Sequence, residues 1–414
     1  MKTRLFFFVS AALLLSASLL WAGGSQEKGA ATGGQPVQIT LGYSGGVWIE
    51  KYFDQVLSQL PSSLKGVTVK KVVYPTYDDL LNTLPSQVAA KTNPDVLYWT
   101  NEQLAEYVGN GVLAKLGGLV SENKIDLGQF YSGLVGGWTI DGALYGVPFN
   151  GQDSALVVNL DLLKQAGIAG PPTSMAELQK DALQIKQKTG ETGVVLLDNL
   201  FHISQYVYAF GGGWGYGKTI DTPQNAQGLQ FLVDLFTKDK SAATAKQLGA
   251  AWDGEAFAKG TVGFSTGGPW YIGYMQQAGP KVHYALLPIP TSTGGTTMVT
   301  YGGGLSVFAN AKDKQAAGRL IAYLTNDANM KLMATSGLKY LPAKTSYMDL
   351  FIQQVPEFAP LKDAFFKGRA LDYPPDVKGF GDDLVKGFEQ MIFQTSKLTP
   401  SELLSQLQSR YGSR

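Results

Sequence analysis

Residues 37–99 contain three short runs rich in β-forming residues: VQITLG (37–42), VTVKKVVY (67–74) and DVLYW (95–99). Helical stretches around 49–60 and 78–90 separate these runs, and a short helix over 102–108 follows the third run. Alternation of short buried strands with helices predicts a mainly parallel sheet that is covered by helices. We expect Pro85 to kink or divide the second helix, because proline lacks a backbone N–H donor.

A second block with the same alternation follows. Further strands are predicted at 155–159, 193–197, 261–265 and 282–287. Ser174, and later Thr222 with Pro223, are residues that typically begin a helix. The chain then returns to a strand at 304–308 and continues in helices near 314–324, near 328–335 and from Thr399-Pro400 onward. The sequence therefore predicts an α/β fold made of two blocks.

The composition excludes several classes of function. The chain has 414 residues, which predicts two or three domains, and its 44% of apolar residues supply a sizeable core. Lys plus Arg number 34 against 33 for Asp plus Glu, so nothing favours nucleic acid or an anionic membrane as a partner. There is no cysteine, which excludes disulfides and thiol catalysis, and there are only two histidines. Neither a metal nor a cofactor is predicted, although a bound calcium ion stays an open question.

The N-terminus reads as an export signal. Lys2 and Arg4 precede a 16-residue apolar stretch over 5–20, and Ala22 supplies a small residue for cleavage. Sixteen residues are fewer than the roughly 20 that span a bilayer, and a lipid anchor would need a cysteine. We therefore predict a signal peptide at 1–22 and a flexible leader at 23–36. The mature protein is expected to be periplasmic or otherwise extracytoplasmic, soluble and not a lipoprotein; the exact cleavage site stays open.

One enzyme motif fails in its context. Residues 212–219, GGWGYGKT, match the phosphate-loop pattern, which requires a helix to open at its Lys-Thr end. Pro223 would fall inside that helix, whereas Thr222 with Pro223 is typical of a new helix start. We therefore expect residues 212–219 to form a glycine-rich hairpin that carries two aromatic residues.

A second enzyme motif also fails. Residues 263–267, GFSTG, match the nucleophile elbow, whose triad runs Ser, then Asp or Glu, then His. His283 is the only histidine after Ser265, and no acidic residue lies between the two. Ser265 is therefore not expected to be a nucleophile, and His202 and His283 are expected to be ordinary polar residues. The sequence indicates a binding protein and not an enzyme; a secreted carbohydrate-active enzyme using acidic residues remains the alternative from another class.

Five stretches, taken in order and spacing, carry a family likeness: DVLYW (95–99) with GVL (111–113), LYGVPF (144–149) with VNLDLL (158–163), GTVGF (260–264) with GPW (268–270), GGGL (302–305) and GLKYLPA (337–343). Together they resemble the extracellular solute-binding proteins of bacterial ABC importers, in the sugar-binding group that is similar to maltose-binding protein. The resemblance covers nearly the whole mature chain. Val157 and Val158 stand where that group usually has paired tyrosines.

The resemblance implies a two-lobed periplasmic-binding-protein fold, with each lobe a mainly parallel sheet and with hinge crossovers between them. Residues 37–147 and 288–334 would form the first lobe, and 148–287 and 335–414 the second. A monomer would close on one ligand in the cleft and deliver it to membrane permease subunits. The expected ligand is a mono- or oligosaccharide; glycerol phosphate and a polyamine remain alternatives, and neither the sugar nor the transporter can be identified.

A sugar presents flat C–H faces and hydroxyl edges, so a sugar site requires aromatic rings and planar polar side chains. We selected the candidate residues on this basis. Trp48, Trp214 and Trp270 stand in or beside glycine-rich loops, where aromatic residues are poorly placed for the core. Trp270 is the strongest of these, because in the resembling family the tryptophan of GPW stacks on sugar. The other predicted contacts, given by family position or by nearness to a turn, are Tyr77, Asn101, Glu102, Gln152, Asp153, Tyr301, Gly302, Gly303, Tyr340 and Arg369.

Overall fold

The computed structural model describes residues 37–412 apart from residues 46, 279–281 and 336–339. The predicted signal peptide and leader lie outside the described residues. Within them, no helix combines the length and the apolar character that crossing a membrane requires.

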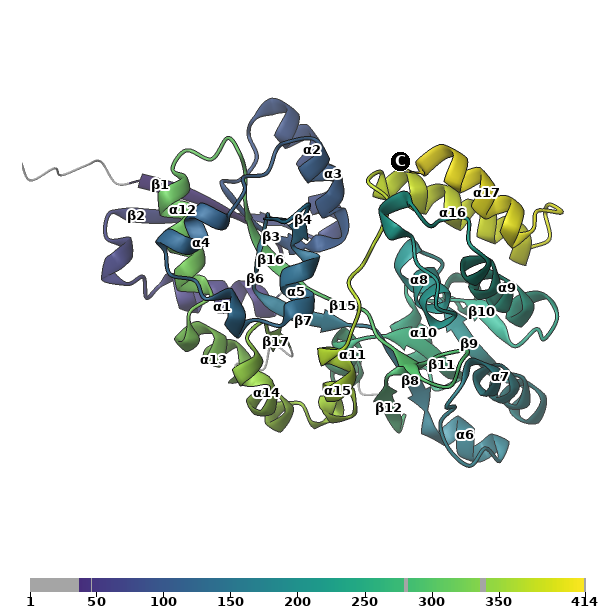
Figure 1. Cartoon of the computed structure of the whole chain (residues 1–414). Coiled ribbons are helices and arrows are strands. Elements are labelled where there is room, and N and C mark those ends of the chain that lie inside the picture. The colour runs from purple at the N-terminus through teal and green to yellow at the C-terminus, as the bar shows by residue number, and fades with distance from the viewer. Residues whose placement is uncertain (1–36, 46, 279–281, 336–339, 413–414) are drawn as a thin grey trace, which may run out of the picture. The chain divides into compact units, whose positions relative to one another are not determined.

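The first sheet contains the three runs that open the chain. Its strand order is β2 (Val67–Tyr74), β1 (Val37–Ser44), β3 (Val96–Thr100), β16 (Gly303–Val307), β6 (Val147–Pro148). β1 pairs in parallel with β2 and β3, whereas β16 is antiparallel to both β3 and β6. Four strands therefore run the same way, and β16, which comes late in the chain, is inserted between two early strands (Figure 1). Apolar side chains such as Ile39, Leu41 and Leu97 are fully buried there.

The second sheet repeats this pattern of directions. Its order is β10 (Ala242–Thr244), β9 (Thr192–Leu196), β11 (Val262–Gly267), β8 (Ala155–Asn159), β12 (Tyr284–Leu287). β9 is parallel to β10 and β11, and β8 is antiparallel to β11 and β12. The predicted fold class, α/β with two mainly parallel sheets, is thus confirmed.

A small third sheet is made of the segments that connect the two large ones. Its strands are β15 (Thr300–Tyr301), β7 (Asn150–Asp153) and β17 (Leu341–Pro342), all antiparallel. β7 lies in sequence between β6 of the first sheet and β8 of the second, and β15 leads into β16. We call β7, β15 and β17 the hinge sheet. The remaining two-residue strands are β4 (Thr139–Ile140), β5 (Ala143–Leu144), β13 (Ile289–Pro290) and β14 (Thr296–Thr297).

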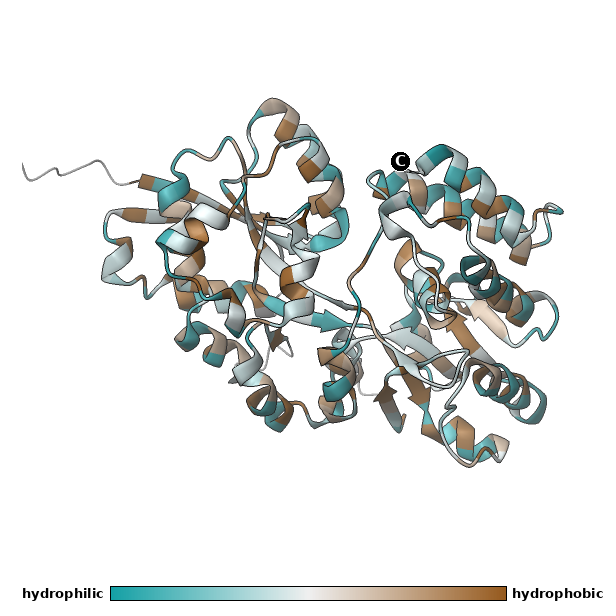
Figure 2. Ribbon diagram, in the orientation of Figure 1, coloured by the Kyte–Doolittle hydropathy of each residue, from teal (hydrophilic) through white to brown (hydrophobic). Residues whose placement is uncertain are grey.

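Helices cover both large sheets. Those before the hinge are α1 (Val47–Leu57), α2 (Tyr77–Ala90), α3 (Leu104–Gly109), α4 (Gly117–Glu122) and α5 (Ser132–Gly137). Those of the second block are α6 (Leu160–Ala166), α7 (Met175–Thr189), α8 (Leu200–Ala209), α9 (Pro223–Thr237), α10 (Asp253–Ala258) and α11 (Pro269–Ala278). The later ones are α12 (Lys314–Leu324), α13 (Asp327–Thr335), α14 (Met348–Gln354), α15 (Lys362–Phe366), α16 (Val377–Ile392) and α17 (Pro400–Tyr411). α12 packs on β1 and β16, whereas α16 and α17 pack on α9. Figure 2 shows hydrophobic residues concentrated on the strands and on the helix faces turned toward them.

The predicted helix starts are confirmed. Ser174, Thr222 and Thr399 each accept a hydrogen bond from the backbone N–H three residues on, at the first turns of α7, α9 and α17. One local prediction is wrong, because residues 212–219 contain a single 3₁₀ turn (Gly215–Gly217) instead of a hairpin. α2 runs through Pro85 without division.

Candidate ligand-binding site

A cavity of about 320 Å³ lies where β1 and β3 end. Ligands bind beyond the carboxyl ends of such strands, because the loops there present backbone and side-chain groups to one crevice. Ser44 and Thr100 close those two strands and both line the cavity; Gln152 and Tyr301 reach it from the hinge sheet. The full lining is Ser44, Gly45, Ile49, Tyr77, Tyr98, Trp99, Thr100, Glu102, Gln152, Tyr301 and Tyr340.

Aromatic rings form much of the wall. The Tyr77 hydroxyl lies 2.5 Å from the Thr100 hydroxyl, which ties the start of α2 to the end of β3. Tyr98 donates a hydrogen bond of 2.8 Å to the Asn150 side-chain oxygen on β7, which ties β3 to the hinge sheet. Tyr301 pairs directly with Gln152 across β15 and β7. These contacts connect the cavity wall to α2, β3 and the hinge sheet.

Glu102 is the acidic residue of the cavity wall. It lies in the 3₁₀ turn Asn101–Gln103, which begins where β3 ends. Burial raises the pKa of Glu102 to about 7, opposed by a hydrogen bond from Thr100. Burial is the main cause that raises the pKa of Tyr301 and of Tyr373, and the charge of Glu102 is the second. Both phenols therefore lie close to the Glu102 carboxyl group.

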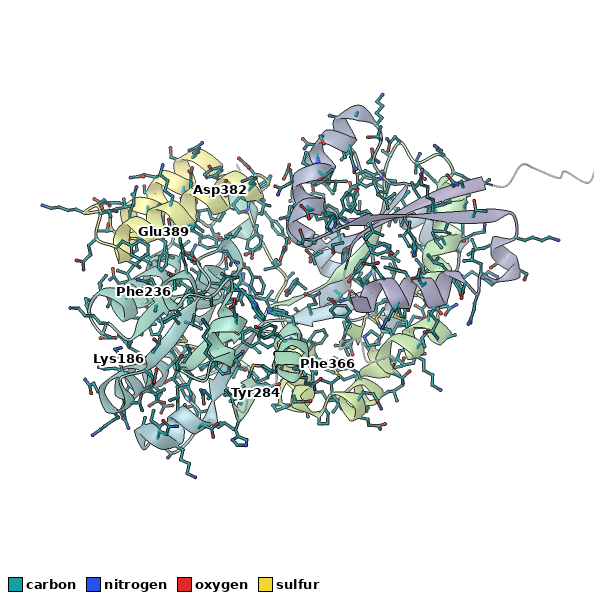
Figure 3. All side chains as sticks on the ribbon, turned by 180° about the vertical axis from the view of Figure 1, so that it is seen from behind. Lys186, Phe236, Tyr284, Phe366, Asp382 and Glu389 are labelled. Carbon is teal, nitrogen blue, oxygen red and sulfur yellow. The ribbon has the colours of Figure 1, made fainter. Side chains whose placement is uncertain are left out.

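A second hollow, of about 680 Å³, shares Glu102 with the cavity. It lies between α2 and α3 on one side and α8 and α16 on the other, and we call it the acidic hollow. Its walls include the carboxylates of Glu106, Asp198, Asp382 and Glu389, the last two of which Figure 3 labels on α16. Lys378 and Lys386 also line it, and Lys378 is paired with Asp382 at 2.7 Å.

Five of the predicted contacts come together in the cavity: Tyr77, Glu102, Gln152, Tyr301 and Tyr340. Asp153 is completely buried but does not line it. Successive residues of a strand face opposite sides, so Gln152 faces the cavity and Asp153 faces away. Neither Asp153 oxygen has a hydrogen-bond partner in another described residue, and burial raises the pKa of this carboxyl to about 8.

Trp214 is in the core, which corrects the prediction that a glycine-rich loop keeps this ring exposed. Its side chain is fully buried, its indole N–H donates to the Ser204 hydroxyl at 2.8 Å, and its ring packs edge-on against Phe380. The reason is that residues 212–217 fold inward as a tight turn, in which Tyr216 takes a positive φ of 55°. The prediction followed the composition of the loop and could not anticipate this direction.

Arg369 and Asn101 hold the chain together and line neither hollow. The Arg369 guanidinium donates to the Gly212 carbonyl at 2.6 Å and to Asp372 at 2.9 Å, and lies over the Tyr208 ring. Asn101 is buried and donates to the Gly137 carbonyl at 2.9 Å. Arg369 is thus held by neighbouring segments, and the amide N–H of Asn101 is used in the same way, whereas the Asn101 side-chain oxygen has no partner among the described residues.

The predicted Trp270 is half-buried and lines neither hollow. Its ring packs edge-on against Phe201, and Phe201 in turn contacts Tyr301 at 5.3 Å between ring centroids. Trp270 is therefore linked to the cavity through two ring contacts. The side chain of Trp48 lies outside the described residues, although its neighbour Ile49 lines the cavity.

Gly302 and Gly303 do not line the cavity but pack against Asn150, and Gly303 also packs against Tyr98, which does line it. A Cβ on Gly302 would overlap the Asn150 carbonyl oxygen, and a Cβ on Gly303 would overlap both the Asn150 side chain and the Tyr98 ring. Glycine is needed at these positions because β7 and β16 approach so closely.

Sequence reasoning missed six of the lining residues: Ser44, Gly45, Ile49, Tyr98, Trp99 and Thr100. Ser44 and Thr100 end β1 and β3 and lie one or two residues beyond the predicted strands 37–42 and 95–99, so the strand-end rule could have found them. Tyr98 reads as a core residue, and it is indeed only 8% exposed. Nothing in the sequence indicates that one edge of the Tyr98 ring reaches the cavity.

The two enzyme motifs have structural roles. Ser265 is fully buried on β11 and donates to the Asp253 carboxylate at 2.8 Å. The Thr222 side chain caps α9, so no helix opens at Lys218 and Thr219. Among the described residues, no group of three or more His, Asp or Glu is arranged to hold a metal ion.

Comparisons with known proteins agree on one family. A family model described as bacterial extracellular solute-binding protein matches residues 62–360. A probable ABC transporter-binding protein of Deinococcus radiodurans is 25% identical over 323 residues, covering 71% of this chain and 76% of that protein. A maltodextrin-binding protein of Bacillus subtilis is 28% identical over 207 residues, 46% of this chain and about half (48%) of its own length.

A solved structure shows the same fold. The ABC substrate-binding protein of Listeria monocytogenes in complex with cycloalternan has a TM-score of 0.78 at 18% identity, covering 91% of this chain and 98% of that chain. At this identity the likeness establishes the fold alone, which is two-lobed as the sequence predicted.

Proposed function

The chain belongs to the family of bacterial extracellular solute-binding proteins, and we propose that it captures a sugar in the cavity at the ends of β1 and β3. One observation carries the proposal: the cavity combines four tyrosines and a tryptophan with the planar groups of Gln152 and Glu102. Rings cover the C–H faces of a sugar, while carboxylate and amide groups bind its hydroxyls in pairs. The relatives named for maltodextrin and cycloalternan support a sugar ligand.

An anionic solute such as glycerol phosphate fits less well. None of the described residues that line the cavity is Lys, Arg or His, so a phosphate would be buried beside Glu102 without a counter-charge. Arg369 does not line the cavity and is held by Gly212 and Asp372.

We propose the lobe boundaries expected from the sequence, 37–147 with 288–334 and 148–287 with 335–414. β7 and the segment β15–β16 connect the two large sheets, so rotation about the hinge sheet would close the acidic hollow over a bound ligand. The protein would act as an exported monomer that delivers its ligand to the permease of an ABC importer, with residues 1–22 as its signal peptide.

The test is a thermal-shift screen over sugars and polyols, followed by calorimetry on each hit. A ligand that binds only the folded protein raises the melting temperature, by an amount set by its concentration relative to Kd. Gln152→Ala should weaken binding of the hit about tenfold or more and leave the unliganded melt near that of the wild type. Gln55→Ala, an exposed glutamine on α1, is the matched control and should bind normally.

Two results would overturn the proposal. Chromatography that shows turnover of an oligosaccharide would make the protein a carbohydrate-active enzyme. Equal affinity of Gln152→Ala and Gln55→Ala would remove the cavity from the binding site.

A further inference from the structure

We propose that the solute carries a protonated amine and that Glu102 is its counter-ion in the cavity. The proposal rests on the sugar-binding function and narrows it to amino sugars or amine-bearing polyols.

The first argument is the unbalanced charge of the cavity. Glu102 is the acidic residue in the described lining, and none of the other residues there carries a positive charge. A neutral sugar can donate hydroxyl hydrogen bonds to Glu102 but brings no opposite charge, so burial, which already raises the pKa of Glu102, would favour the protonated carboxyl over the ionised one. A protonated amine compensates the charge and brings three N–H donors.

The second argument is the set of rings around this carboxylate. Tyr77, Tyr301 and Tyr373 lie close enough for the charge of Glu102 to raise the pKa of each phenol, after burial, which is the larger cause. Aromatic faces attract cations through their negative quadrupole, most strongly where water is excluded. A carboxylate among tyrosines is therefore suited to an ammonium group.

The third argument is the charge of the acidic hollow. The acidic hollow shares Glu102 with the cavity and adds Glu106, Asp198, Asp382 and Glu389 against two lysines. Burial and the neighbouring charge of Asp198 raise the pKa of Glu389, and burial and Asp376 raise that of Glu106, so like charges crowd here. Such a field concentrates cationic solutes and repels anionic ones.

The experiment compares glucosamine with glucose, which differ by an ammonium for one hydroxyl, by calorimetry near pH 7, where the ionised Glu102 and the protonated amine are both populated. The dimers chitobiose (both amines free) and cellobiose are compared in the same way. We expect the amine to bind at least about tenfold tighter, and this preference should fall as salt rises. Glu102→Gln should weaken amine binding about 30-fold or more and neutral-sugar binding by much less, because the amide still forms hydrogen bonds with hydroxyls but carries no charge, so the preference for the amine should disappear. Glu122→Gln, an exposed carboxylate on α4, removes the same charge and should keep the preference.

The outcomes separate this proposal from the proposed function. Neutral sugars that bind as tightly as their amines, or a preference that survives in Glu102→Gln, overturn the amine proposal and leave the sugar-binding function standing. Binding of putrescine with no binding of any sugar overturns the sugar-binding function. Thermal melts of both variants show whether they are folded.

Discussion

Individual residues show where sequence reasoning reached the site and where it failed. Tyr77, Glu102 and Gln152 were predicted by family position or by nearness to a turn, and all three line the cavity. Trp214 failed because the direction in which a loop folds depends on tertiary contacts, here with Ser204 and Phe380. Asp153 was predicted as a ligand contact, but alternation along β7 turns it away from the cavity.

The buried carboxyl group of Asp153 should make the stability of the protein depend on pH. Its pKa is raised to about 8 in the folded protein from 3.8, so the folded state holds a proton that the unfolded state loses. This contribution to stability is complete below about pH 4 and is lost as pH rises toward 8. Asp153→Asn cannot ionise, so relative to the wild type it should gain about 2 kcal/mol or more between pH 5 and pH 8. Urea unfolding at both pH values measures this, and the exposed Asp221→Asn is the control. Parallel pH curves for Asp153→Asn and wild type would contradict it.

At the scale of elements, the strands were predictable and the connections were less so. Strands 67–74 and 155–159 match β2 and β8 residue for residue, because short runs of Val, Ile, Leu and Tyr have few alternatives to a buried strand. The pairing of β7 with β15 and β17 was not predictable, because these strands are short, polar and joined only by tertiary contacts. The sequence revealed the hinge sheet only as a glycine-rich turn at 302–304.

A substitution at Gly303 tests whether the close packing of β7 against β16 is required for stability. Gly303→Ala should destabilise the protein by about 1–3 kcal/mol, because its Cβ would overlap the Asn150 side chain and the Tyr98 ring. It should also weaken ligand binding, since Tyr98 lines the cavity. Gly118→Ala on α4, where a Cβ would meet nothing, should be neutral or stabilising by up to about 1 kcal/mol. Equal stability of the two variants in denaturant melts would show that β7 and β16 can separate without cost.

At the scale of the whole molecule, two sheets with the same pattern of strand directions are joined through short hinge strands. The alternation of strands and helices, which occurs twice along the chain, predicted two α/β blocks, and the family resemblance implied that these blocks are two lobes. Which side chains meet across the acidic hollow was not predictable, because α2 and α16 lie about 300 residues apart in sequence and come together only in the folded chain.

The last prediction concerns closure of the acidic hollow. The chain has no cysteine, so a pair of cysteines can be introduced and spin-labelled without background. Asn82 on α2 and Lys386 on α16 are exposed and line opposite sides of the hollow. Rotation about the hinge sheet should shorten and narrow the Asn82→Cys/Lys386→Cys distance distribution when ligand is added, because a ligand that contacts both sides favours the closed state. Lys186→Cys/Lys386→Cys joins α7 and α16, which both belong to the proposed second lobe (148–287 with 335–414), and its distance distribution should stay the same. If the first pair is also unchanged at saturating ligand, the solute binds without closure, and the hinge sheet is a rigid connection.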